Sequence, residues 1–216
     1  MPFCVGLTGG LASGKTSAAK HFEDLGAGVV DTDAIAHELT RPGTAAMGKI
    51  GEVFGPDFVA PDGSLARAKM RQLVFRDRQA RAKLEAILHP LIREQTRGRL
   101  AAAQQPYVIV VVPLLLETGA YRELVQRVLV VDCSEAQQIE RATRRSGLEE
   151  SDVRAILAAQ LSRKERLERA DDVIDNSGGV EVMRGQVDAI HAKYLALAQS
   201  VARENAPTRR SREGAC

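Results

Sequence analysis

Residues 7–17, with the sequence LTGGLASGKTS, constrain the fold of this chain more than any other segment. The segment matches the pattern G-x-x-x-x-G-K-[ST] of the Walker A phosphate-binding loop, formed by Gly9, Gly14, Lys15 and Thr16. A phosphate chain must approach bare backbone N–H groups, and glycine allows this because it tolerates positive φ and has no Cβ. The lysine supplies a charge for the β- and γ-phosphates, and the threonine hydroxyl is suited to ligate Mg²⁺.

The segments on either side of the loop come in the order that the motif requires. Residues 3–7 form a short apolar run that predicts a strand, and Ala18, Phe22 and Leu25 recur after the loop at helical spacing. A helix that begins at the loop points the positive end of its dipole at a bound anion. We therefore expect this loop to bind a nucleoside triphosphate, rather than to be a glycine-rich turn that binds nothing.

Composition argues against several classes of partner. A net charge of +2 is too small for a general nucleic-acid binder, and eight aromatic residues without tryptophan provide little base stacking. No apolar run approaches the ~20 residues of a membrane span, and the chain enters a strand too early for a signal peptide. The three cysteines, Cys4, Cys133 and Cys216, lack metal-type spacing and predict two buried thiols and a loose one. We expect a cytoplasmic protein.

Two carboxylates follow the second predicted strand, residues 28–31. Asp31 and Asp33 stand at the carboxyl end of a strand beside a phosphate loop, where open α/β sheets bind ligands. Asp33 could accept the proton of an attacking hydroxyl or help to hold Mg²⁺. The alternative is that Asp33 only caps the helix that contains Ile35. We favour a functional role for Asp33, and for Asp31 both interpretations stay open.

Residues 44–103 show helical periodicity and almost no strand signal. Between residues 66 and 103, ten Lys or Arg residues stand against three Asp or Glu residues. Such a basic face can dock an anionic substrate, or it can be an ordinary solvated helix surface. Pro90 is expected to interrupt one of these helices. His89 alone is more often a packing or capping residue than a catalytic one.

The second half of the chain alternates buried strands with helices. Asp132 follows one of these strands, and we interpret it as structural because Ser134 marks a helix start there. Residues 135–169 are helical and rich in arginine, which suits phosphoryl transfer because charge spreads over the moving phosphoryl oxygens. The tail from residue 203 is polar and predicts disorder.

These elements predict a single unit over residues 1–202, an α/β P-loop NTPase with a doubly wound five-stranded parallel sheet. The expected strands lie near residues 3–7, 28–31, 107–112, 128–132 and 172–175. The core comprises residues 1–40, 104–134 and 170–202, with a helical acceptor-binding insertion at 41–103, a helical lid at 135–169 and a tail at 203–216. This is the plan of a small-molecule kinase.

The chain resembles the dephospho-CoA kinases over residues 3–200. The resemblance is carried by the run Gln138, Arg141 and Arg145 and by the segments GLTGGLASGKT, DTDAIAHEL, HPLIR, VPLLLE, AILAAQ and ADDVIDNSG. It implies that ATP, with Mg²⁺, phosphorylates the ribose 3′-hydroxyl of dephospho-CoA to give coenzyme A and ADP, the last step of CoA biosynthesis. The partner is then a small molecule, with no nucleic acid or membrane involved, and the oligomeric state stays open.

The resemblance also implies roles for particular residues. The catalytic residues would be Asp33, as the base, Lys15 and Arg141. ATP would be bound by Gly10, Ala12, Ser13, Gly14, Lys15, Thr16, Ser17, Arg145 and Asn176, and Thr16 would ligate Mg²⁺. The acceptor would be bound by Thr8, Asp33, His89, Arg93, Leu115 and Glu117. The departures from the family pattern are Ala12 for a common glycine, Thr32 for a common alanine and Leu116 for a common phenylalanine.

The main alternative is another P-loop small-molecule kinase, such as a nucleoside monophosphate kinase. A GTP switch would need a guanine-reading N-K-x-D after a strand, and the sequence has D-C-S and D-N-S at such positions. The residues alone indicate phosphoryl transfer to a small anionic acceptor, and only the resemblance names dephospho-CoA.

Overall fold

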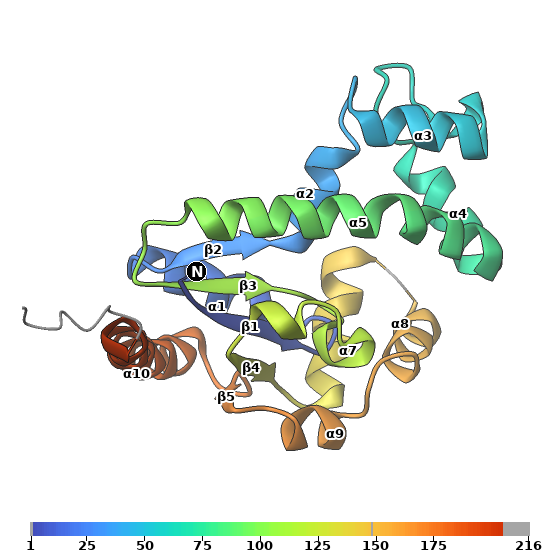
Figure 1. Ribbon diagram of the computed structural model, residues 1–216. Helices are drawn as coiled ribbons and strands as arrows, with labels where there is room; N and C mark the ends of the chain where they lie inside the picture. The colour runs from blue at the N-terminus through green and yellow to red at the C-terminus, as the bar shows by residue number, and fades with distance from the viewer. Residues whose placement is uncertain (1, 148, 205–216) are drawn as a thin grey trace, which may run out of the picture.

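The computed structural model describes residues 2–147 and 149–204, and it confirms the predicted α/β fold class. One sheet contains five strands in the order β2-β3-β1-β4-β5, all paired in parallel (Figure 1). The strands are β1 (Phe3–Gly9), β2 (Gly28–Asp31), β3 (Tyr107–Val111), β4 (Arg127–Asp132) and β5 (Asp172–Asp175). Each lies close to its predicted range, so the apolar runs alone located the sheet.

Helices connect the strands and extend beyond the sheet edge at which the strands end (Figure 1). The helices flanking the sheet are α1 (Lys15–Asp24), α2 (Thr32–Leu39), α5 (Arg78–Ala102), α6 (Leu115–Thr118) and α10 (Val180–Glu204). The other described helices are α3 (Ala45–Phe54), α4 (Arg67–Arg76), α7 (Glu135–Ser146), α8 (Glu150–Ala158) and α9 (Arg163–Glu168). Two 3₁₀ turns, η1 (Pro56–Phe58) and η2 (Arg122–Leu124), complete the described elements.

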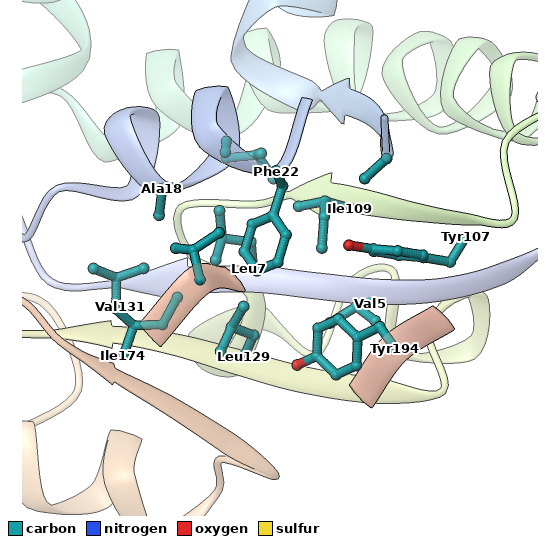
Figure 2. Close-up of a cluster of buried hydrophobic side chains, with 14 of the residues drawn as sticks. Val5, Leu7, Ala18, Phe22, Tyr107, Ile109, Leu129, Val131, Ile174 and Tyr194 are labelled. Carbon is teal, nitrogen blue, oxygen red and sulfur yellow. The ribbon is translucent and has the colours of Figure 1, made fainter. Parts of the chain in front are cut away.

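The central strands are covered on both faces. Alternate residues of a strand point to opposite faces, so an uninterrupted apolar run is what a doubly covered strand requires. On one face, Leu7 and Leu129 pack against Phe22 of α1 and Tyr194 of α10 (Figure 2). On the other face, the intervening strand residues pack against Leu100 of α5 and its neighbours. The sheet is therefore doubly wound, and helices on both faces hold its polar edge in place.

The prediction that Pro90 interrupts its helix is wrong. Helix α5 runs without a break for 25 residues with Pro90 inside it. A proline in a helix interior costs about 3 kcal/mol because it removes a hydrogen bond and crowds the preceding turn. Ile92 and Leu100 are buried against the sheet, and Leu84 packs on the cluster beneath α3 and α4. Packing on both sides of the proline thus keeps the helix continuous.

The structure also bears on the expectations for Asp132, the cysteines and the tail. Asp132 accepts hydrogen bonds from both the Nε and the Nη2 of Arg163, the shortest 2.7 Å long, in agreement with a structural role. Cys4 and Cys133 are buried free thiols, whereas Cys216 lies outside the described residues. The predicted tail begins too early, because α10 continues to Glu204, and its remainder also lies outside the described residues. Over the described part of the chain, no helix is both long and apolar enough to cross a membrane.

A nearly buried carboxylate fastens the start of β5 to its surroundings. The side chain of Asp172, 8% exposed, accepts hydrogen bonds from Arg127 at 2.8 Å, from Tyr194 at 2.9 Å and from Lys193. Burial by itself raises the pKa of Asp172, but these donors outweigh it and hold the pKa below its ordinary value. A lowered folded-state pKa stabilises the protein above the unfolded-state pKa of about 3.9, and this contribution is lost as the pH falls through the folded-state value.

We predict that Asp172→Asn lowers the free energy of unfolding at pH 7 by about 3–5 kcal/mol, the usual effect of breaking a buried ion pair. Urea titration at pH 7 and pH 3 measures it, and the deficit should shrink at pH 3. Glu181→Gln is the control, because Glu181 is 78% exposed and its pair with Arg184 should contribute less than about 1 kcal/mol. Equal stability losses in both variants would contradict the assignment.

Candidate functional site

The Walker A segment forms a tight loop between β1 and α1, and its geometry depends on Gly14. This residue has φ of +105°, and a Cβ at its position would overlap the Nδ2 of Asn176. The same Nδ2 donates a 2.7 Å hydrogen bond to the backbone oxygen of Ser13. Asn176 comes from the segment after β5, so the loop is held by a residue 163 positions away in the chain. Only glycine fits this close approach of backbone to side chain.

Ala12 and Ser13, the two residues before Gly14, differ in conformation and burial from an ordinary loop residue. Ala12, which replaces the glycine common in the resembling family, adopts φ of +53°, so the left-handed loop conformation is kept without glycine. Ser13 is fully buried, and its Oγ has no hydrogen-bond partner among the described residues. Alanine at position 12 therefore still adopts the left-handed conformation of a tight turn.

Lys15 is folded over its own loop. Its Nζ donates 2.9 Å hydrogen bonds to the backbone oxygens of Gly9 and Gly10. Burial lowers the pKa of Lys15 to about 8, while the nearby charge of Asp33 acts in the opposite direction. The ammonium group is thus held beside the loop by weak backbone acceptors, which an anion can replace.

A first cavity, of about 620 Å³, opens over this loop. Every residue from Leu11 to Ser17 lines it, and so does Asn176. The opposite wall carries three arginines of α7, namely Arg141, Arg144 and Arg145. Arg141 is fixed there by a 2.9 Å hydrogen bond from its Nη2 to the backbone oxygen of Asn176. Glycine backbone, one lysine and three arginines form a donor set that fits a triphosphate.

A second cavity, of about 740 Å³, lies between α2, α5 and the segment after β3. The basic residues in its lining are Arg81, His89, Arg93 and Arg97 of α5. They are four or eight positions apart, and this spacing places their side chains on one face of the helix. Part of the basic face is neutralised, since Arg93 and Arg97 both lie 3.4 Å from the Oε1 of Glu123. Arg81 pairs with Glu85 at 2.8 Å, but Arg93 and Arg97 share the one carboxylate of Glu123, so this part of the lining keeps positive charge that suits an anion.

Asp33 stands where the two cavities meet, because it lines both of them. The capping alternative applies to its neighbour: Asp31 accepts hydrogen bonds from the backbone N–H groups of Asp33 at 2.8 Å and Ala34 at 3.3 Å. The side chain of Asp33 is therefore free of the capping role. Burial raises the pKa of Asp33, the Asp31 charge raises it further, and Lys15 opposes both.

The structure brings most, but not all, of the expected site residues to the cavity walls. Among the described residues, the two linings do not include Thr8, Leu115, Glu117 or Gly10. Thr8 donates a 3.1 Å hydrogen bond to the oxygen of Pro113, and the Leu115 side chain is buried in the core. Glu117 accepts a 3.2 Å hydrogen bond from the backbone of Leu161.

Sequence reasoning missed several lining residues. Arg97 could have been found from its four-residue spacing with Arg93. Arg144 shares α7 with the two arginines that the resemblance singled out. Tyr121, which packs its ring 5.9 Å from the guanidinium of Arg93, and Gln160 give no signal in the sequence.

The parallel sheet, the Walker A loop and the second cavity beside it are the features expected of a P-loop kinase. A dephospho-CoA kinase family model matches residues 3–181. A dephospho-CoA kinase of Nitrosospira multiformis is 60% identical over 195 residues, covering 90% of this chain and 98% of that protein. The chain belongs to the dephospho-CoA kinase family.

Solved structures agree with the fold. The dephospho-CoA kinase of Campylobacter jejuni matches with a TM-score of 0.66 and 23% identity, covering 93% of this chain and all of that one. The shikimate kinase of Acinetobacter baumannii matches with a TM-score of 0.51 and 17% identity, covering 93% and 95% of the two chains. The sheet and its helices are therefore those of the P-loop kinases.

We predict that Gly14→Ala lowers kcat/KM for ATP on the order of 10²-fold, because the new Cβ displaces either the loop or Asn176 and small displacements are costly at a reacting centre. Steady-state kinetics and calorimetric ATP titration measure the effect. The control is Gly48→Ala in α3, where the added Cβ has no atom within 4 Å beyond its chain neighbours and the nearby backbone of its own helix, so ATP affinity should be unchanged. Wild-type ATP affinity in Gly14→Ala would contradict this geometry.

Proposed function

We propose that this chain transfers the γ-phosphoryl group of ATP to the ribose 3′-hydroxyl of dephospho-CoA, giving coenzyme A and ADP. The observation that carries the proposal is the position of Asp33 on the wall shared by the two cavities. A donor bound on one side and an acceptor bound on the other then meet at one carboxylate. Family membership supports dephospho-CoA as the acceptor.

The loop cavity binds ATP in this proposal. Lys15 leaves the oxygens of Gly9 and Gly10 for the stronger acceptors of the β- and γ-phosphates. Arg141 and Arg145 meet the triphosphate from the opposite wall, where they stabilise the charge that spreads over the transferred group. Asn176 braces the loop through Ser13 and borders the adenosine side of the cavity.

The α5 cavity binds the acceptor. Its volume of about 740 Å³ lies within the ordinary range for small-molecule sites. Dephospho-CoA carries a pyrophosphate, which the arginine-lined face of α5, with His89 and Arg93, can neutralise. Thr8, Leu115 and Glu117 do not line the cavity, but Pro113, Leu114 and Thr118 do. Thr8 donates a hydrogen bond to Pro113, and Leu115 and Glu117 are chain neighbours of the other two, so we propose that they shape the acceptor side indirectly.

Asp33 accepts the proton of the attacking 3′-hydroxyl. A general base works best when its pKa approaches the operating pH, and burial beside Asp31 moves the pKa of Asp33 in that direction. Thr16 is exposed at the start of α1 and lines the loop cavity, which fits a Mg²⁺ ligand. In the described part of the chain, no group of three or more His, Cys, Asp or Glu side chains could hold a metal ion. Mg²⁺ would neutralise charge on the phosphates.

We further propose that residues 41–103 form the acceptor-binding insertion and residues 135–169 a lid that carries the three arginines. Helices α7 and α8 project from the sheet edge at the side of the loop (Figure 1). Closure of such a segment would exclude water from the reacting phosphoryl group. We place the reaction in the cytoplasm, where ATP is available.

An acceptor panel tests the proposed function directly. ATP consumption is measured with dephospho-CoA, AMP, CMP and shikimate at equal concentrations, and phosphorus NMR assigns the position of the new phosphate. Dephospho-CoA should give the highest kcat/KM, with the product phosphorylated at the 3′ position. A higher kcat/KM with AMP or CMP would instead identify a nucleoside monophosphate kinase.

We predict that Asp33→Asn lowers kcat by about 10²–10⁴-fold and leaves the ATP dissociation constant within about threefold of wild type, because the amide keeps the shape but cannot accept the proton. Rapid-quench kinetics and calorimetry measure the two quantities. Asp31→Asn is the matched control, since asparagine still caps α2 and this carboxylate touches the backbone only. If Asp31→Asn loses more activity than Asp33→Asn, the assignment of the base is wrong.

A further inference from the structure

Arg166 is a buried arginine behind the phosphate-binding loop. It lies in α9 and is 4% exposed. The capping box of Ser162 and Glu165 fixes the start of this short helix and so directs the next turn inward. Arg166 does not line either cavity. Its effect on a bound nucleotide must therefore pass through the loop.

The guanidinium of Arg166 lies against the second residue of the loop. A Cβ added to Gly10 would meet the Nη2 of Arg166 at 2.9 Å and the Oε1 of Gln138 at 2.5 Å. Gln138 is 2% exposed and donates from its Nε2 to the backbone oxygen of Cys133 at 3.3 Å. Two buried polar side chains thus form a fixed surface on which the backbone of Gly10 rests.

The charge of Arg166 has no direct counter-ion. Over the described residues, no carboxylate lies within ion-pair distance of it, whereas the exposed Arg163 on the same helix pairs with Asp132 at 2.7 Å. Burying a cation without a paired anion is costly, and an apolar side chain would satisfy the packing better. Packing alone therefore does not explain a charged side chain at position 166, whereas support of an adjacent anion-binding loop does.

The same group of contacts fastens the connection between α8 and α9 to the loop. The Oε1 of Gln160 accepts a 3.1 Å hydrogen bond from the backbone N–H of Leu11. The backbone of Leu161 donates to Glu117 at 3.2 Å and accepts from the Nη1 of Arg166. Glu117 also has an Oε2 that is buried without a partner among the described residues. The C-terminal end of the proposed lid and the loop are therefore held by one network.

We propose that Arg166 is a positioning residue for phosphoryl transfer, which holds the Gly10 side of the loop against the α8–α9 connection. The guanidinium reaches both sides of this junction, since its Nη2 lies against Gly10 and its Nη1 donates to the backbone oxygen of Leu161. Loss of the guanidinium should therefore loosen the Gly10 side of the loop.

The test compares Arg166→Met, which removes the charge but keeps the length, with Arg166→Lys, which keeps the charge but loses the planar fork. Arg166→Met should lower kcat/KM for ATP on the order of 10²-fold, with KM for dephospho-CoA within about twofold of wild type. Arg166→Lys should lose about tenfold. Lys164→Met is the control: it removes a charge from the same helix at a site that is 86% exposed, and its kinetics should equal wild type.

Two measurements on the ligand-free protein, hydrogen exchange of the loop and the melting temperature, separate positioning from general stability. Hydrogen exchange of the loop in Lys164→Met should equal wild type. Hydrogen exchange of residues 9–16 should be faster in both Arg166 variants while the melting temperature of Arg166→Lys stays within a few degrees of wild type.

The inference rests on the proposed function only for its kinetic part. If the wild-type protein does not phosphorylate dephospho-CoA, the proposed function fails, and the loop exchange still decides the role of Arg166. Wild-type kcat/KM for ATP in Arg166→Met, or wild-type loop exchange in both Arg166 variants, would overturn the inference. If Arg166→Met does not fold, Arg166→Lys decides, and wild-type kinetics with wild-type loop exchange in that variant would overturn it.

Discussion

The parallel pairing of β1 between β3 and β4 is the constraint on which the whole site depends. All five strands run in one direction, so each ends at the same edge of the sheet. The register sets Gly9 beside Val131 and Asp31 beside Val111, which brings the loop and the carboxylates to that edge. Helices buried against both faces keep this edge fixed, as ligand sites of open α/β sheets require. The chemistry of the site is therefore a consequence of sheet topology.

The parts of the site that depend on local pattern could be predicted from the sequence. Uninterrupted apolar runs located the strands, and the spacing of glycines with Lys15 and Thr16 located the loop. Pro90 was misjudged because the cost of a proline in a helix is local, whereas the packing of Ile92 and Leu100 that offsets it is tertiary. Local rules therefore fail where distant contacts contribute more free energy.

The choice between two neighbouring carboxylates illustrates what a sequence leaves open. Asp31 and Asp33 both suit a cap and a base, and only the observed hydrogen bonds assign the cap to Asp31. Gln160 and Arg166 gave no signal because their partners, Leu11 and Gly10, are about 150 residues away in the chain. Residues within the motif can be identified from sequence spacing, whereas the distant residues that hold the motif in place are identified only from the three-dimensional structure.

In the proposed reaction, donor and acceptor meet directly at Asp33, with no phosphorylated enzyme between them. Direct in-line transfer inverts the configuration at phosphorus, whereas transfer through an enzyme nucleophile takes two inversions and retains it. The most direct measurement uses ATP made chiral at the γ-phosphorus with oxygen isotopes and reads the configuration of the product phosphate. Direct transfer at Asp33 predicts inversion. Retention would contradict it, because a side chain would then have to carry the phosphoryl group between the two cavities.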